Sequence, residues 1–202
     1  VWFIEIPMSI AAVALMIMFP LELRRSVLLP PMSLEQIRGL LENRQYREAI
    51  EFSAADPSML GVVVHASLSE AASGYGAMER AMEEAVDERV SKQLRKIEFL
   101  NIIGNIAPMV GLFGTVVGMI QTFEVIRMQA VPSPAELAEG IGVALVTTYW
   151  GLLIAIPALS AFALLRNHIE AMSSEVSLRT QQLLSIFNPS AQRAAAASRP
   201  AV

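Results

Sequence analysis

Two stretches of the sequence, residues 99–123 and 140–165, contain no Asp, Glu, Lys or Arg, and each carries a stripe of small residues that includes threonine. The stripes recur every three or four residues, as one face of a helix does: Gly104, Pro108, Gly111, Thr115, Gly118 and Thr122 in the first, and Gly140, Ala144, Thr148, Gly151, Ala155 and Ala158 in the second. A threonine hydroxyl on such a face can line an ion path or contact a partner helix. It can also bond to a carbonyl of its own helix.

Thr115 and Thr148 are predicted to lie at the same depth. Each is eight residues from the end of its stretch that faces the intervening loop, or roughly 12 Å along an antiparallel pair of helices. The matched depth favours an ion path or a partner contact over a purely local hydrogen bond. The small residues Gly111, Gly118, Ala144, Gly151 and Ala155 are predicted to pack helices closely or to line a pore.

Neither stretch contains a group that could carry a proton, since His is absent from both as well. Proton relays and cation sites in membranes ordinarily use ionisable side chains. Glu5 interrupts a third apolar run, residues 1–21, and is predicted near the outer end of its helix, a poor position for a carrier at mid-membrane. We therefore expect any titrating carboxylate to come from another chain.

The two charge-free runs are long enough to form membrane-spanning helices, and these helices would position the threonines. Helices of 25 and 26 residues measure roughly 37–39 Å, enough to cross a hydrocarbon core of about 30 Å. Over all 202 residues, 54% are hydrophobic and 17% charged, with a mean hydropathy of +0.49. A net charge of −4 argues against nucleic-acid binding, and no cysteine, P-loop or G-x-S-x-G motif supports enzymatic chemistry.

Basic residues are distributed very unevenly around the three runs. Ten Lys and Arg lie in residues 22–98, four follow residue 165 and one lies in the loop between the second and third runs. The positive-inside rule therefore predicts an outward N-terminus and an inward C-terminus. The predicted order is transmembrane helix 1 (1–21), a cytoplasmic helical segment (22–98), transmembrane helix 2 (99–126), a periplasmic loop (127–139), transmembrane helix 3 (140–165), a cytoplasmic helical extension (166–187) and a disordered tail (188–202).

The cytoplasmic part is predicted to be helical. Ser33 and Gln36 form a capping-box pattern, and an apolar period of three to four residues runs without a break from Ala77 into the second membrane run. Residues 166–187 likewise lack Pro and Gly. The sequence thus predicts an all-α membrane protein with three transmembrane helices, two of them extended into a cytoplasmic bundle. We expect neighbouring subunits to cover much of the apolar face of these extensions. The sequence begins at Val1 rather than Met, which is compatible with further residues upstream.

Two blocks of the sequence resemble the MotA/TolQ/ExbB family of ion-driven motor subunits. They are APMVGLFGTVVGMIQTF, residues 107–123, and GIGVALVTTYWGLLIAIPA, residues 140–158. Three helices with an outward N-terminus resemble the ExbB/TolQ branch. The resemblance implies a homopentamer in a bacterial inner membrane, around two copies of a single-span ExbD- or TolR-like partner that carries a membrane aspartate. It also implies that Thr115 and Thr148 face that aspartate and that H⁺ or Na⁺ is the coupling ion.

Three positions depart from the family pattern. Val143 stands where typical ExbB and TolQ sequences have a glutamate, which leaves the coupling ion open. Tyr149 and Trp150 are large aromatics deep in a membrane helix, where they either pack on lipid or a neighbouring subunit, or add the Tyr149 hydroxyl to an ion site.

Two other classes of protein fit parts of the pattern. A non-conducting oligomeric scaffold would use the small stripes for packing alone. A secondary transporter would need more helices and internal repeats. The sequence does not identify the process that is powered, which depends on the partner.

Overall fold

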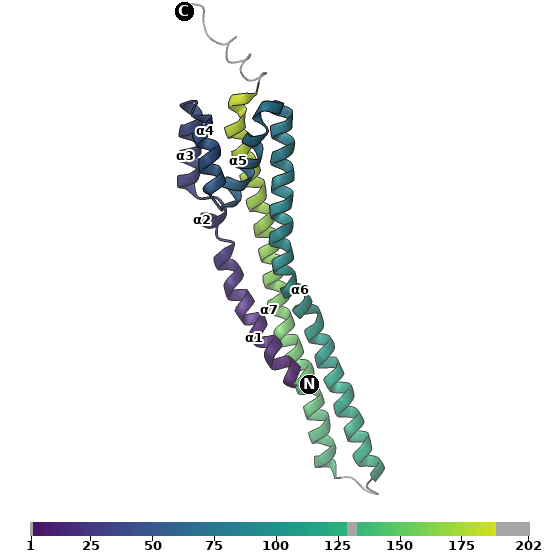
Figure 1. Ribbon diagram of the computed structural model, residues 1–202. Helices are drawn as coiled ribbons and strands as arrows, with labels where there is room; N and C mark the ends of the chain where they lie inside the picture. Colours follow the sequence, from purple (N-terminus) through teal and green to yellow (C-terminus); the bar gives the residue numbers. More distant parts are fainter. Residues whose placement is uncertain (1, 129–132, 189–202) are drawn as a thin grey trace, which may run out of the picture. The chain divides into compact units, whose positions relative to one another are not determined.

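The structure is a computed structural model that describes residues 2–128 and 133–188, and every regular element within those residues is helical. Figure 1 shows the chain as a series of α-helices with two single turns of 3₁₀ helix. The α-helices are α1 (Trp2–Glu22), α2 (Arg25–Leu28), α3 (Pro31–Glu42), α4 (Tyr46–Ala55), α5 (Met59–Ser69), α6 (Tyr75–Met128) and α7 (Pro134–Leu184), and the 3₁₀ turns are η1 (Ala71–Ser73) and η2 (Ser185–Phe187). The all-helical prediction is confirmed.

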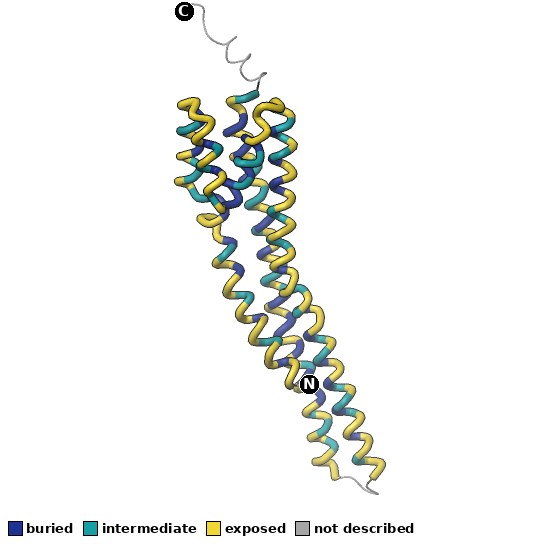
Figure 2. The backbone as a smooth tube through the Cα atoms, in the orientation of Figure 1, coloured by how far each residue is buried: buried dark blue, intermediate teal, exposed yellow. Residues whose placement is uncertain are grey.

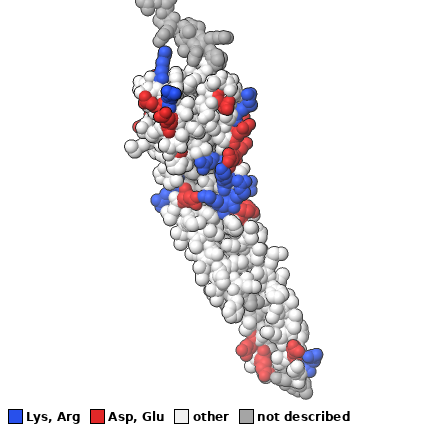
Figure 3. Space-filling model, in the orientation of Figure 1, with Lys and Arg blue, Asp and Glu red and all other residues white. Residues whose placement is uncertain are grey.

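Three of these helices contain a segment long and apolar enough to cross a membrane. They are α1, α6 and α7, and their most apolar windows have mean hydropathies of 2.0, 1.7 and 1.8. On the face drawn in Figure 3, the corresponding surface is free of Lys, Arg, Asp and Glu between charged ends. Pro108 and Pro157 lie inside the long helices α6 and α7, as is tolerated where neighbouring helices satisfy the backbone. The three predicted membrane helices are therefore present.

The chain divides into two compact units. The first, here called the transmembrane unit, comprises Val1–Leu21 and Arg95–Arg166, which are α1 and the apolar parts of α6 and α7. The second, here called the polar unit, comprises Glu22–Leu94 and Asn167–Val202. Helix α6 is uninterrupted over 54 residues. The helix predicted from the apolar period that starts at Ala77 therefore continues into the membrane run.

The polar unit has an aliphatic core of its own. Helix α4 packs against α3 and α5, and buried residues, dark blue in Figure 2, occur along the helices of this unit. They include Ile37, Leu41, Leu60, Val63, Val64, Met78, Met82, Val176 and Leu184. The last four belong to the extensions of α6 and α7, for which we expected cover from neighbouring subunits. That expectation is wrong for these residues, because the chain itself buries them.

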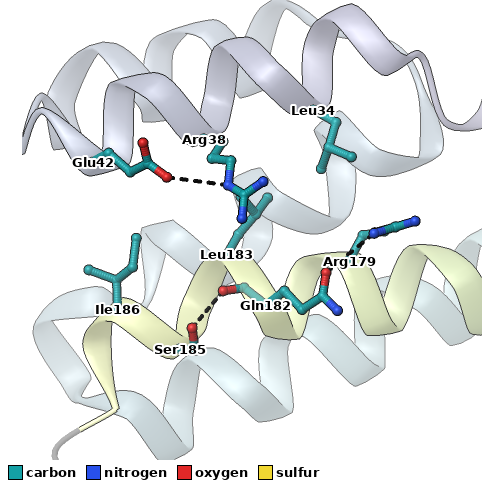
Figure 4. Close-up of a pocket in the computed structure, with 8 residues that line it drawn as sticks. All are labelled: Leu34, Arg38, Glu42, Arg179, Gln182, Leu183, Ser185 and Ile186. Atoms are coloured by element: carbon teal, nitrogen blue, oxygen red, sulfur yellow. Dashed lines mark hydrogen bonds and ion pairs between the residues drawn. The ribbon is translucent and has the colours of Figure 1, made fainter. Parts of the chain in front are cut away.

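A shallow groove of about 160 Å³ lies where α3 runs beside the end of α7 (Figure 4). Leu34, Arg38 and Glu42 line it from α3, and Arg179 and Gln182 line it from α7. Arg38 is paired with Glu42 at 3.3 Å on the same helix. The groove thus belongs to the packing of α3 on α7 within the polar unit.

One ion pair ties α2 to α7. The Arg25 guanidinium donates two hydrogen bonds to the Glu175 carboxylate, from Nε to Oε2 at 3.2 Å and from Nη2 to Oε1 at 2.5 Å. The hydrogen bond and charge of Arg25 hold the pKa of the Glu175 carboxyl below its usual value. The same contact raises the pKa of Arg25. Because the two residues are 150 positions apart, the pair fixes the start of the polar unit to its last helix.

The residues at the starts of α3 and α5 explain where these helices begin, and α3 begins at another residue than predicted. The capping box predicted at Ser33 and Gln36 is wrong: α3 already begins at Pro31, so Ser33 lies within its first turn. Proline is favoured in the first turn because its missing N–H needs no partner there. Ser58 is a true cap instead, since its Oγ accepts a hydrogen bond of 3.0 Å from the Gly61 N–H at the start of α5.

Candidate functional site

Helices α6 and α7 of the transmembrane unit meet backbone to backbone along a seam of small residues. A Cβ atom added at Gly151 would lie 2.6 Å from the Ala107 carbonyl oxygen, and one at Gly111 would lie 2.9 Å from the Thr147 carbonyl oxygen. Farther along, a Cβ at Gly118 would lie 2.9 Å from that of Ala144. Such close approach gives the van der Waals contact that holds helices together in lipid. No larger residue fits these positions without moving a helix.

The buried seam is rotated slightly from the stripes read in the sequence. Ala107 and Gly114 occupy it on α6 in place of Pro108 and Thr115, which are half-buried. On α7, Thr147 is 3% exposed and occupies it, whereas Thr148 lies at its margin. Ala144, Gly151 and Ala155 are buried there as well. Sequence reasoning missed Thr147, although its place three residues after Ala144 and four before Gly151 was the signal that could have found it.

Thr115 and Thr148 flank the seam on one side and at one level. The contacts of Gly111 with Thr148 and of Gly118 with Ala144 set an antiparallel register, in which Thr115 lies within about one turn of Thr148. At 3.6 residues per turn, both threonines project on the same side of the seam. Helix α1 packs on the other side, where Ala12 meets Ala107 and Ile154. The two hydroxyls are therefore neighbours on a face that α1 leaves open.

The hydroxyl protons of both threonines are already used. Thr115 donates from Oγ1 to the Leu112 carbonyl at 2.6 Å, three residues back in its own helix. Thr148 donates across the seam to the Gly111 carbonyl at 3.2 Å. The hydroxyl of the buried Thr147 donates to the Ala144 carbonyl of its own helix at 2.7 Å and also lies 3.2 Å from the Gly111 carbonyl oxygen. A hydroxyl that donates in this way keeps lone pairs that accept a hydrogen bond or coordinate a cation. The pair can therefore receive a proton donor or a cation, but it cannot itself titrate near neutral pH.

Tyr149 does not join the threonine pair in the structure. Its side chain is 61% exposed, and its ring meets that of Trp150 edge-on with centroids 6.0 Å apart. Val143, which stands in place of a glutamate and so leaves the coupling ion open, is 49% exposed on the surface of α7.

Glu5 lies in the first turn of α1, near the end of its helix, as the sequence predicts. It borders a cavity together with Trp150 and Ile154 of α7, which are about 15–21 Å along α7 from Gly140. That end of α1 therefore lies beside the middle of the charge-free run of α7 rather than beside its outer end, which the sequence does not predict. The reason is that α1 is offset along its neighbours, and the position of a residue within one helix does not determine such an offset.

A charge-free antiparallel helix pair with a small-residue seam, joined by a third apolar helix, defines a helical integral membrane protein. The chain belongs to the MotA/TolQ/ExbB proton channel family, whose pattern matches residues 55–177. The matched region contains the seam and both threonines but not α1.

Individual relatives point to the ExbB/TolQ branch. The biopolymer transport protein ExbB of Pseudomonas putida is 30% identical over 161 residues, which are 74% of this chain and 48% of the relative. A putative ExbB-like protein of Synechocystis is 39% identical over 51% of this chain and 38% of its own length. The Tol-Pal system protein TolQ of Pseudomonas aeruginosa is 39% identical over 41% of this chain and 36% of its own length. The chain thus spans about half the length of these relatives or less.

Proposed function

We propose that this protein is an ExbB/TolQ-like subunit of an ion-driven membrane motor. It converts a proton or sodium gradient into mechanical work on an envelope partner, and it is not an enzyme. Membership of the proton channel family and the similarity to proteins named ExbB and TolQ support this proposal.

The observation that carries the proposal is the hydroxyl pair Thr115 and Thr148. The two lie at one level on the open side of a charge-free helix pair, with their protons donated to backbone carbonyls. Their oxygens are available to accept a hydrogen bond from a protonated carboxyl or to coordinate Na⁺. Since neither charge-free run has an Asp, Glu, Lys, Arg or His, the group that gains and loses charge comes from a partner helix placed against this face.

The assembly that we propose is the one implied by the family resemblance, and it meets that requirement. Five copies surround two copies of a single-span, ExbD- or TolR-like subunit, whose membrane aspartate stands beside the threonines. The ring lies in a bacterial inner membrane, with residues 1–21, 99–126 and 140–165 in the bilayer. Of the 15 Lys and Arg residues, 14 lie in residues 22–98 or after residue 165. By the positive-inside rule, this distribution favours a periplasmic N-terminus and a cytoplasmic C-terminus.

The test is ion flux in proteoliposomes that contain this chain with and without an aspartate-bearing single-span partner. We expect flux only when both chains are present, and loss of flux when the partner aspartate is changed to Asn. In this chain, Thr148→Val should lower the flux, and Thr148→Ser, which keeps a hydroxyl, should restore it. Flux that does not depend on the aspartate, or no flux from a stable complex, would favour a non-conducting scaffold.

Native mass spectrometry tests the assembly separately. A monomer of 22.0 kDa gives a five-fold ring of about 110 kDa, to which two partner chains would add their mass. A monomer or dimer that binds no such partner would contradict the proposed ring.

A further inference from the structure

Glu5 is the one carboxyl that α1 places inside the transmembrane unit. Its side chain is 2% exposed, and neither carboxylate oxygen has a hydrogen-bond partner among the described residues. Buried polar groups in proteins almost always have such partners. An ionisable residue within a membrane helix is costly to keep and commonly marks a functional site.

The carboxyl borders a cavity of about 290 Å³ between α1 and α7. Ile6, Ile10 and Ile154 line this cavity together with Ser9 and Trp150, so the Ser9 hydroxyl and the Trp150 indole are its other polar groups. Ser9 is one turn from Glu5 on the same face of α1. The cavity is large enough to hold a water molecule.

The surroundings offer no charged partner to Glu5. The facing runs of α6 and α7, residues 99–123 and 140–165, contain no Asp, Glu, Lys, Arg or His. Within α1 the next charged residue is Glu22. An isolated carboxylate in such an apolar place costs far more free energy than a carboxylic acid, so the site favours a bound proton.

We propose that Glu5 is a proton-binding site that belongs to this chain, separate from the threonine pair. Trp150 and Ile154, which border it, lie on the α1 side of the seam, whereas Thr115 and Thr148 project on the opposite side. At neutral pH the carboxyl holds its proton, and it exchanges that proton through the cavity between α1 and α7. The proposal does not require the motor function, because it concerns a group that the chain carries without any partner.

The experiment is labelling with dicyclohexylcarbodiimide, an apolar reagent that reacts with protonated carboxyls. The acid adds across one C=N bond of the carbodiimide: its proton goes to nitrogen, its oxygen bonds to the central carbon, and rearrangement leaves a stable N-acylurea with nothing lost. The full-length chain in detergent or liposomes is labelled from acid to alkaline pH. The modified residue is then located by fragment mass spectrometry.

We expect Glu5 to be labelled at neutral pH and the label to be lost as the pH rises. E5Q should lose the label from this peptide, whereas the matched variant Glu124→Gln, at an exposed carboxyl on α6, should keep it. A charged, water-soluble carbodiimide should leave Glu5 unmodified.

Absence of label at Glu5 at neutral pH, or labelling equal to that of exposed carboxyls, would overturn the proposal. Because the label at Glu5 is measured in the chain without any substitution, the test does not depend on whether E5Q folds. Because no partner or flux is involved, its failure would also be distinct from failure of the motor proposal.

Discussion

Exchanging single glycines of α7 for alanine tests whether the seam holds the transmembrane unit together. Gly151→Ala adds a Cβ that would lie 2.6 Å from the Ala107 carbonyl oxygen and 3.2 Å from the Gly111 Cα. Both are backbone atoms, which cannot rotate away. Gly142→Ala, on the same helix, adds a Cβ with nothing within 4 Å and is the matched control.

The structure sets the expected magnitudes. Relieving the contact at Gly151 requires the helices to separate by about 0.5–1 Å, which forfeits a quarter to a half of the local dispersion energy. Overpacking of this kind costs about 1–3 kcal/mol. Gly142→Ala meets no obstacle and gains up to about 1 kcal/mol from the better helix propensity of alanine. We therefore expect Gly151→Ala to be destabilised and Gly142→Ala to be unchanged or slightly more stable.

The assay is equilibrium unfolding in mixed micelles with increasing dodecyl sulfate, followed by tryptophan fluorescence, with circular dichroism to confirm that the helices remain formed at the start. The protein has two tryptophans, and Trp150 lies one residue from Gly151. Equal stability of the two variants, or a greater loss for Gly142→Ala, would show that α6 and α7 do not meet along this seam.

Four further substitutions test other parts of the structure. Thr147→Val, which removes a buried hydroxyl bonded to the Gly111 carbonyl, should cost about 0.5–1.5 kcal/mol in the same titration, whereas Thr115→Val should lower flux and leave assembly intact. Glu175→Gln should lower the unfolding temperature at neutral pH and have no effect in acid. The folded-state pKa of Glu175 is depressed, so its contribution is complete above the unfolded-state pKa and is lost as the pH falls through the folded-state pKa. Ser58→Ala removes the α5 cap and should cost about 0.5–2 kcal/mol in thermal unfolding of the full chain.

The membrane helices could be predicted because their signal is local. A run without charges, together with an unbroken apolar period, is enough to identify α6 as a helix that continues from the polar unit into the membrane segment. The capping box at Ser33 failed for an equally local reason. Pro31 favours the first helical turn by its fixed φ, and α3 therefore begins before the serine.

The arrangement between helices was harder to predict. A spacing of three and four residues defines two adjacent stripes on α7, one through Thr147 and one through Thr148, and only the facing helix decides which is buried. The depth of Glu5 depends on the axial offset of α1 against α7. A sequence read one helix at a time contains neither quantity. The threonine pair was identified from the sequence, but its hydrogen-bond donation across the seam was not.

The position of Glu5 also has a consequence for biosynthesis. The helix that shelters this carboxyl, α7, is synthesised long after α1: Trp150 follows Glu5 by about 145 residues, which takes roughly 7–30 s at 5–20 residues per second. During that interval the first helix must enter the bilayer with its carboxyl unsheltered, at an insertion cost of about 2.5–3.5 kcal/mol if it lies at the bilayer centre. The most apolar window of α1 has a mean hydropathy of 2.0 even with Glu5 included, so the helix is apolar enough to offset that cost. The nascent chain therefore passes through a stage at which a chaperone or insertase of the membrane would find a polar group exposed in α1.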